Sequence, residues 1–192
     1  DGSATITQGS FPASVDLSAL DGSDGFTIEG LVLRDQLGYS VANGGDVNGD
    51  GIDDLIIGAP YAENGTLDAA GKAYVVYGTD TGFAADLDLS TLDGTNGFEV
   101  TTGIAGDELG HSVSGVGDVN GDGIDDFAVG SFKAHVGPAS DAGKAWIVFG
   151  DAGGFPAQVN VDTLDGTDGF VFNGDKNDDY AGRVVSSAGD IN

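Results

Sequence analysis

The feature that most constrains this chain is an internal repeat with a period of 72 residues. A heptapeptide that begins Leu-Asp-Gly and ends Gly-Phe stands at residues 20–26 and recurs at 92–98 and 164–170. The same offset relates Asp46 to Asp118. Because the 192 residues hold about 2.7 such periods, the repeat accounts for nearly the whole chain. Equal units of this size indicate a tandem repeat architecture rather than a single irregular domain.

Each period contains four short segments with the alternation and the β-branched and aromatic residues of strands, separated by Gly and Asp. The predicted strands are 38–43, 54–59, 72–77 and 97–101 in the first copy, and 110–115, 126–130, 144–149 and 169–173 in the second. Further strands are predicted at 3–7, 25–29 and 182–187. The 35 glycines favour tight turns, and no helix of ordinary length is expected.

A four-stranded antiparallel unit repeated in tandem is typical of a β-propeller blade and, less often, of a sandwich array. The fold class predicted is therefore all-β. Two blades are expected, at 30–101 and 102–173, with the end of a preceding blade at 1–29 and the start of a further blade at 174–192. Propellers close with about four to eight blades, so about 2.7 repeats are too few to close a ring alone. We therefore expect a fragment of a longer protein.

Charge and composition narrow the classes of function. The 6 Lys and Arg residues stand against 32 Asp and Glu residues, and the resulting formal charge of -26 repels nucleic acids and anionic membranes. Only four of the acidic residues are Glu, and so much Asp is expected in turns or on metal ions. Cysteine is absent, which excludes disulfides, thiolate zinc sites and a cysteine nucleophile.

The most specific chemistry lies between the first two strands of each repeat. Residues 46–54 and 118–126 are identical in sequence, with oxygen-bearing side chains at positions 1, 3, 5 and 9 and Gly at position 6. Hard cations such as calcium bind about six to eight oxygen ligands, and position 7 would add its backbone carbonyl. The lack of nitrogen and sulfur ligands disfavours zinc and copper. The spacing predicts a metal-binding loop in each repeat.

The acidic loop has other possible interpretations. An EF-hand would need a bidentate Glu at position 12 of the loop, where the chain has Ile57 and Val129. An Asp/Asn/Gly turn that binds no metal is the plainer alternative, and general screening of the negative charge by any salt is another. Asp53 and Asp125, at position 8, are expected to face solvent because adjacent side chains in an extended segment point to opposite sides.

Taken together, these motifs resemble the FG-GAP repeat. The resemblance rests on Leu-Gly-Tyr-Ser-Val at 37–41, the acidic loop, Leu-Ile-Ile-Gly-Ala-Pro at 55–60 and the segment 71–78. The second copy has Gly-Ser-Phe in place of Gly-Ala-Pro, and the third copy departs at its first Gly. This family builds the seven-bladed β-propeller of integrin α subunits and of many secreted microbial proteins. The resemblance implies an extracellular or cell-surface protein with a role in adhesion or recognition.

The resemblance also implies calcium as the cofactor and a ligand set for each loop. In the first loop the ligands would be Asp46, Asn48, Asp50, the Ile52 carbonyl and Asp54. In the second loop they would be Asp118, Asn120, Asp122, the Ile124 carbonyl and Asp126. Only Asp190 and Asn192 of the third loop are present.

No catalytic residue is predicted. His111 occupies the repeat position of Tyr39, which indicates strand packing, and Ser112 lacks the following Gly and helix of a nucleophile elbow. A carboxylate pair for glycoside hydrolysis stays an alternative among the 32 acidic residues, although every repeating Asp already has a turn or a metal role. The sequon at Asn64 would matter only in a eukaryotic secretory pathway.

Three functions follow as hypotheses. The first is a calcium-stabilised adhesion or recognition segment, whose protein or glycan ligand binds the variable loops on the face opposite the metal loops, at 30–37, 61–70, 103–109, 133–142 and 174–180. The second is a non-catalytic accessory module of a secreted hydrolase or lyase. The third is a structural repeat of a cell-surface array or filament, in which blade edges join neighbouring copies of the chain.

Overall fold

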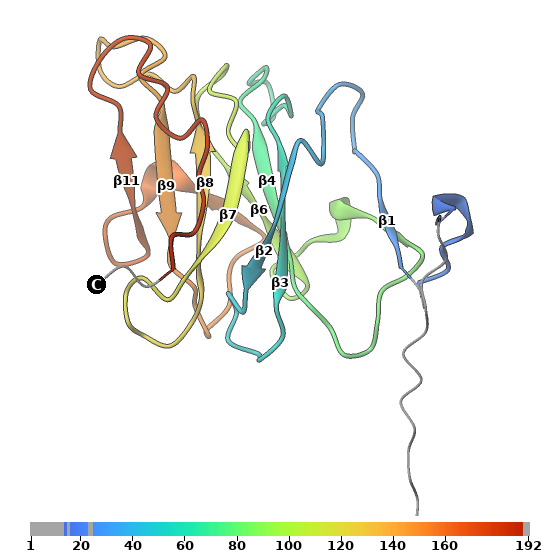
Figure 1. The fold of residues 1–192 in the computed structure, drawn as a ribbon. Helices are drawn as coiled ribbons and strands as arrows, with labels where there is room; N and C mark the ends of the chain where they lie inside the picture. The colour runs from blue at the N-terminus through green and yellow to red at the C-terminus, as the bar shows by residue number, and fades with distance from the viewer. Residues whose placement is uncertain (1–13, 15, 23–24, 190–192) are drawn as a thin grey trace, which may run out of the picture.

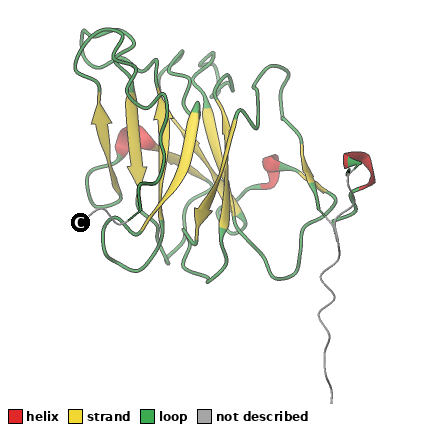
Figure 2. Ribbon diagram, viewed as in Figure 1, coloured by secondary structure: helices red, strands yellow, loops and turns green. Residues whose placement is uncertain are grey.

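The computed structural model describes residue 14, residues 16–22 and residues 25–189 (Figure 1). Its strands are β1 (Thr27–Ile28), β2 (Ser40–Gly45), β3 (Asp54–Ala59), β4 (Lys72–Val76), β5 (Asp86–Leu87), β6 (Gly97–Thr101), β7 (Ser112–Gly117), β8 (Asp126–Ser131), β9 (Lys144–Val148), β10 (Gln158–Asn160) and β11 (Gly169–Asn173). Three single-turn 3-10 helices complete the elements: η1 (Leu17–Ala19), η2 (Leu89–Thr91) and η3 (Val161–Thr163). The all-β prediction is confirmed (Figure 2).

Two four-stranded antiparallel units stand side by side, as the repeat predicts (Figure 1). The first has the strand order β6-β4-β3-β2 and the second the order β11-β9-β8-β7. Each first strand carries a bulge, between Asn43 and Gly45 in β2 and between Gly115 and Gly117 in β7. The bulges fall just before the acidic loops and increase the local twist there. Within each four-stranded unit the strands pair in chain order, and the sheets are open in the part of the chain that the structure describes.

Two further strands were not predicted. β10 pairs in parallel with β6, and β5 pairs in parallel with β1. Both come from the connection that follows the third strand of a unit, and β10 attaches to the outermost strand of the first unit. The second unit is thus joined by backbone hydrogen bonds to the first, and the first unit is joined in the same way to β1. Sequence patterns missed these strands because they are only two or three residues long and too short to show an alternation.

Two of the other predicted strands have different outcomes. The strand predicted at 182–187 is wrong, because the described residues there form no ladder. Instead, the Val185 and Ser187 amides donate to the Ser112 and Ser114 hydroxyls, at 2.9 and 3.2 Å. The strand predicted at 3–7 lies outside the described residues. No helix in the described part of the chain is long and apolar enough to cross a membrane.

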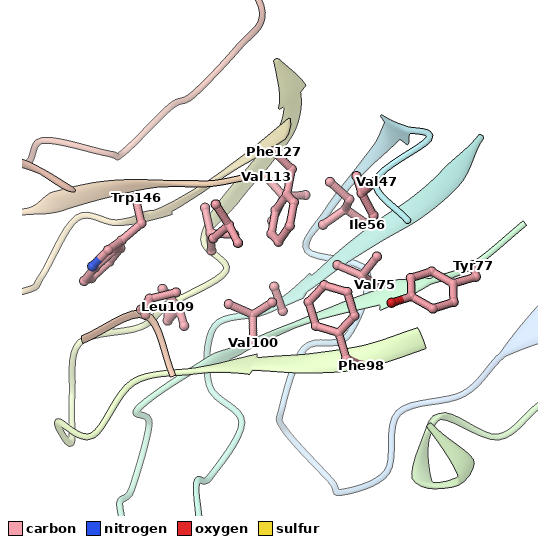
Figure 3. Close-up of a cluster of buried hydrophobic side chains, with 14 of the residues drawn as sticks. Val47, Ile56, Val75, Tyr77, Phe98, Val100, Leu109, Val113, Phe127 and Trp146 are labelled. Carbon is pink, nitrogen blue, oxygen red and sulfur yellow. The ribbon is translucent and has the colours of Figure 1, made fainter. Parts of the chain in front are cut away.

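A shared hydrophobic core fills the space between the two sheets (Figure 3). The first sheet contributes Phe98, Val75 and Ile56, and the second contributes Phe127 and Trp146. All five are at most 2% exposed. The inner strands β2 and β7 approach so closely that a Cβ at position 115 would lie 2.5 Å from the Asn43 carbonyl oxygen, so this position requires Gly. The core therefore holds the two units in a fixed relation.

The antiparallel order sorts the connections into two groups (Figure 1). The acidic loops, which join β2 to β3 and β7 to β8, lie at one end of the strands, at the bottom of the view. The connections 60–71 and 132–143 lie at the other end, at the top of the view, together with the segments 30–39 and 102–111 that enter the inner strands. The acidic end and the variable end are thus opposite faces of one scaffold.

Candidate functional site

The acidic loops are wound tightly by their own side chains. In the first loop, the Asp46 carboxylate accepts from the amides of Asp50 at 2.9 Å and Gly51 at 2.8 Å. The Asp50 carboxylate accepts from the Ile52 amide at 2.9 Å, and the Asn48 side chain bonds both the amide and the carboxylate of Asp50 at 2.9 Å. Gly51 has a φ of +90°, which favours the residue without a side chain.

The second loop repeats this geometry. Asp118 accepts from the Asp122 amide at 3.1 Å and from the Gly123 amide at 2.9 Å. Asp122 accepts from the Ile124 amide at 2.9 Å, and Asn120 again bonds Asp122 through both its amide nitrogen and its oxygen. Identical sequences therefore give the same local conformation in both repeats.

The last acid of each loop is buried and connects the loop to the neighbouring strand end. Asp54 is 2% exposed and accepts from the Val47 amide at 3.0 Å and the Gly78 amide at 2.8 Å. Burial raises the pKa of Asp54 to about 6, and the nearby Asp50 and Asp46 carboxylates add to the rise. Asp126 is fully buried, and burial raises its pKa too. Each of these carboxylates thus accepts from two backbone amides, one of them at a buried contact.

The donor set of both loops consists of oxygen atoms, as a hard cation requires. In this structure the carboxylates at positions 1 and 5 are directed at loop amides. Within residues 16–22 and 25–189, no three His, Cys, Asp or Glu side chains are gathered closely enough to form a metal site. The donor chemistry fits calcium, while the metal-ligand assignment remains a prediction. Asp190 and Asn192 lie outside the described residues.

The two acids at position 8 behave differently. Asp53 is exposed, as predicted, and accepts from the Asn43 side-chain amide at 2.8 Å. The same prediction is wrong for Asp125, which is half-buried and accepts from the Asp46 backbone amide of the first loop at 3.1 Å. The reason is tertiary: the second loop lies against the first, so a side chain that leaves its own loop meets the neighbouring one. The sequence carries no signal that separates Asp53 from Asp125.

The opposite end of the scaffold exposes apolar side chains. Large hydrophobic residues that are at least 38% exposed gather in its loops and strand entries: Leu31, Val32, Leu33, Tyr39, Tyr61 and Ile104. A hollow of about 430 Å³ lies between residues 32–36 and 61–69. This end is therefore the more apolar face.

The backbone of this end is conserved between repeats although its side chains vary. Non-glycine residues with positive φ recur at Gln36, Glu108 and Tyr180, spaced by 72 residues. Ala69 and Asp141 form a second such pair. One backbone template therefore carries a different side chain in each repeat.

Asp107, also at this end, is a buried acid that sequence reasoning missed. It is 1% exposed, and neither carboxylate oxygen has a hydrogen-bond partner within the described part of the chain. The nearby Thr102 hydroxyl donates to Asp162 Oδ2 at 2.9 Å. Burial raises the pKa of Asp107 to about 6, and the Lys144 ammonium opposes that rise. The sequence does not indicate that Asp107 lacks partners, because the equivalent residue of the first repeat, Asp35, accepts from the Val32 and Leu37 amides.

The histidines have packing and hydrogen-bonding partners. His111 Nε2 lies 3.1 Å from the Tyr39 hydroxyl and Nδ1 lies 3.2 Å from the Arg183 carbonyl oxygen, while its ring contacts Phe132. His135 Nδ1 accepts from the Asp141 amide at 3.2 Å. The predicted packing role of His111 is confirmed.

Comparison with known proteins gives the same assignment as the motifs. The FG-GAP repeat model matches residues 37–76 and 109–148. Integrin alpha pat-2 of Caenorhabditis elegans is 36% identical over 99 residues, which are 52% of this chain and 7% of that protein. Integrin alpha-6 of Gallus gallus is 33% identical over 147 residues, 75% of this chain and 12% of that protein.

A relative of another kind is the phosphatidylinositol-glycan-specific phospholipase D of Mus musculus, 35% identical over 121 residues, 62% of this chain and 14% of that protein. The chain therefore spans a small part of each of these relatives. The strand order of the two matched segments is that of successive blades of an open β-propeller. The chain thus carries two FG-GAP repeats, at residues 37–76 and 109–148, and is similar to integrin α subunits over part of their length.

Proposed function

We propose that this chain is a calcium-binding propeller segment of an extracellular or cell-surface protein that serves adhesion or recognition. The observation that carries the proposal is the pair of identical oxygen-donor loops at one end of two joined blades. The likeness to integrin α subunits supports the adhesion role and the extracellular location. A non-enzymatic role is part of the proposal, and the likeness to integrin α subunits supports it.

Calcium would be held by the loop residues at positions 1, 3, 5, 7 and 9. These are Asp46, Asn48, Asp50, the Ile52 carbonyl and Asp54 in the first loop, and Asp118, Asn120, Asp122, the Ile124 carbonyl and Asp126 in the second. When bound, the cation would neutralise carboxylates that otherwise repel one another. The chain's own contribution is to hold these oxygens on a short, glycine-permitted turn that leads into a buried strand, β3 or β8.

A thermal unfolding titration tests this proposal. At a calcium concentration of about 100 times Kd, each site would add about 2.7 kcal/mol to the free energy of unfolding. For a chain of this size, two sites correspond to a rise in Tm of about 10 °C or more over the chelated protein. Ionic strength is held constant with NaCl. An equal rise with sodium at matched ionic strength, without saturable calcium binding, would refute specific calcium binding.

Matched variants assign the ligands. Asp50→Ala removes a proposed ligand at position 5, whereas Asp53→Ala removes an exposed carboxylate three residues away. Asp50→Ala is expected to weaken calcium binding at least about tenfold, as the loss of a charged ligand costs more than 1.4 kcal/mol. Calorimetric titration that gave the same affinity for both variants would contradict the assignment.

The opposite, more apolar end is proposed to bind a protein partner. Leu33 is 93% exposed beside the hollow between residues 32–36 and 61–69, and such a side chain at the rim of a hollow is typical of an interaction site. Leu33→Ser should weaken binding to a panel of purified extracellular-matrix proteins. Leu17→Ser, which changes another exposed leucine elsewhere in the fold, serves as the control. Equal binding by both variants would contradict this assignment.

The likeness to a phospholipase D favours a second candidate function, a non-catalytic accessory module of a secreted hydrolase or lyase. A catalytic domain in the same gene product would support it. A structural repeat in a surface array is the third candidate, and concentration-dependent polymerisation would support that one.

A further inference from the structure

We propose that Asp125, at position 8 of the second acidic loop, is a positioning residue for the first acidic loop and couples the two loops. We call the hydrogen-bonded contact between Asp125 and Asp46 the clamp. It involves only atoms of the chain and does not depend on a bound cation. Its consequence for cation binding rests on the calcium binding proposed above. The experiment below separates a failure of the clamp from a failure of calcium binding.

Three hydrogen bonds from the second unit hold two consecutive residues at the start of the first loop. The Asp46 amide donates to Asp125 Oδ2 at 3.1 Å, and the Asp125 amide donates to the Asp46 carbonyl at 3.2 Å. The Asp151 amide donates to the Val47 carbonyl at 3.0 Å. Because Asp46 occupies position 1 of the first loop, these bonds fix the point from which that loop departs.

The fit at this contact is close. Gly45 has a φ of +75°, and a Cβ at this position would lie 2.2 Å from Asp125 Oδ2. Val47 is fully buried, whereas Val119 at the same position of the second loop is 51% exposed. The two loops are identical in sequence, so the difference in burial comes from the second unit, which covers the first loop.

The position of Asp125 within its own loop explains the coupling. It stands between Ile124 and Asp126, whose carbonyl and carboxylate are two of the proposed ligands of the second loop. A cation held there would order the backbone on both sides of Asp125 and thereby fix its carboxylate against the Asp46 amide. The first loop would then lose less conformational entropy when it binds a second cation, which is positive cooperativity without a change of fold. By linkage, the effect is reciprocal.

Asp53 provides a matched control. It has the same residue type and the same loop position as Asp125, but it is exposed and bonds the Asn43 side chain of its own sheet. Removing Asp53 therefore takes away an equal charge and a hydrogen bond, without touching the contact between the loops.

Hydrogen exchange in EDTA tests the clamp without metal. Asp125→Ala should make the amides of residues 46–52 exchange about tenfold faster, the effect of losing one charge-assisted hydrogen bond. Asp125→Asn removes the charge but keeps an acceptor oxygen. It should restore most of the protection if the hydrogen bond protects these amides, and it should restore none if the charge does. Asp53→Ala should leave the Asp46 amide unchanged. Equal exchange at Asp46 in Asp125→Ala and in Asp53→Ala would overturn the clamp.

A calcium titration followed at individual amides tests the coupling. The Gly51 signal reports on the first loop, and Asp122→Ala disables the second. If the loops are coupled, Asp122→Ala lowers the calcium affinity of the first loop about threefold or more, and it has no such effect when Asp125→Ala is already present. An unchanged first-loop affinity in Asp122→Ala would overturn the coupling. Absence of saturable binding in the parent protein would instead refute the calcium function while the exchange result still supports the clamp.

Discussion

Phe98 offers the sharpest test of the core between the two sheets. Its side chain is fully buried, stacks on Phe155 with ring centroids 4.3 Å apart, and lies 6.1 Å from Phe127 and 6.0 Å from Tyr77. Phe170 stands at the same position of the next repeat, in the same heptapeptide motif, but is only half-buried. The comparison isolates the packing of one unit on the next, because the local sequence pattern is the same.

The magnitudes follow from burial. Replacing a fully buried Phe with Ala removes its transfer free energy and leaves a cavity, at a cost of about 3–5 kcal/mol. The offset stack on Phe155 adds about 1 kcal/mol, so we expect Phe98→Ala to lose about 4 kcal/mol or more of unfolding free energy. Phe170→Ala should lose about 1–2 kcal/mol, since part of its surface already contacts solvent.

Urea unfolding gives the free energy of unfolding of Phe98→Ala and of Phe170→Ala. Trp146 is the single tryptophan and is 2% exposed in the same core, so its fluorescence reports the loss of that packing. Phe98→Leu, with an expected loss nearer 1 kcal/mol, covers the case in which the alanine variant does not fold. Losses for Phe98→Ala and Phe170→Ala that agree within 1 kcal/mol, in EDTA and in calcium alike, would refute the reasoning.

Two further predictions follow from single positions. Gly45→Ala and Gly117→Ala both place Cβ at positive φ, but only the first meets Asp125, so it should cost about 1 kcal/mol more by urea unfolding, and Asp125→Ala should remove the difference. Asp107 has a raised pKa, about 6, so its protonated form stabilises the fold at low pH, and this contribution is lost as pH rises through 6. Asp107→Asn has no carboxyl group to titrate at this position. Its free energy of unfolding, relative to that of the parent, should therefore increase by about 2–3 kcal/mol as the pH rises from 4 to 7, and a pH-independent difference would contradict this.

The sequence alone was enough for the repeating unit. Strands β3, β4, β6, β8, β9 and β11 begin at the residues predicted, because β-branched and aromatic segments with turn-forming Gly and Asp at their ends are specified by local pattern. The winding of the acidic loops is also local, since Asp46 and Asp50 bond amides no more than five residues away. The resemblance to FG-GAP repeats rested on these local motifs, and the comparisons confirm it.

Only the tertiary structure decided how one repeat meets the next. Val47 and Val119 have the same neighbours in sequence, yet one is fully buried and the other is 51% exposed. Asp53 and Asp125 diverge in the same way, and β10 exists as a strand because the edge of β6 accepts it. A repeat with identical local sequence carries no record of which copy is covered, because burial and edge pairing depend on residues far along the chain. The pattern therefore determines each blade, and the packing between blades determines what its loops contact.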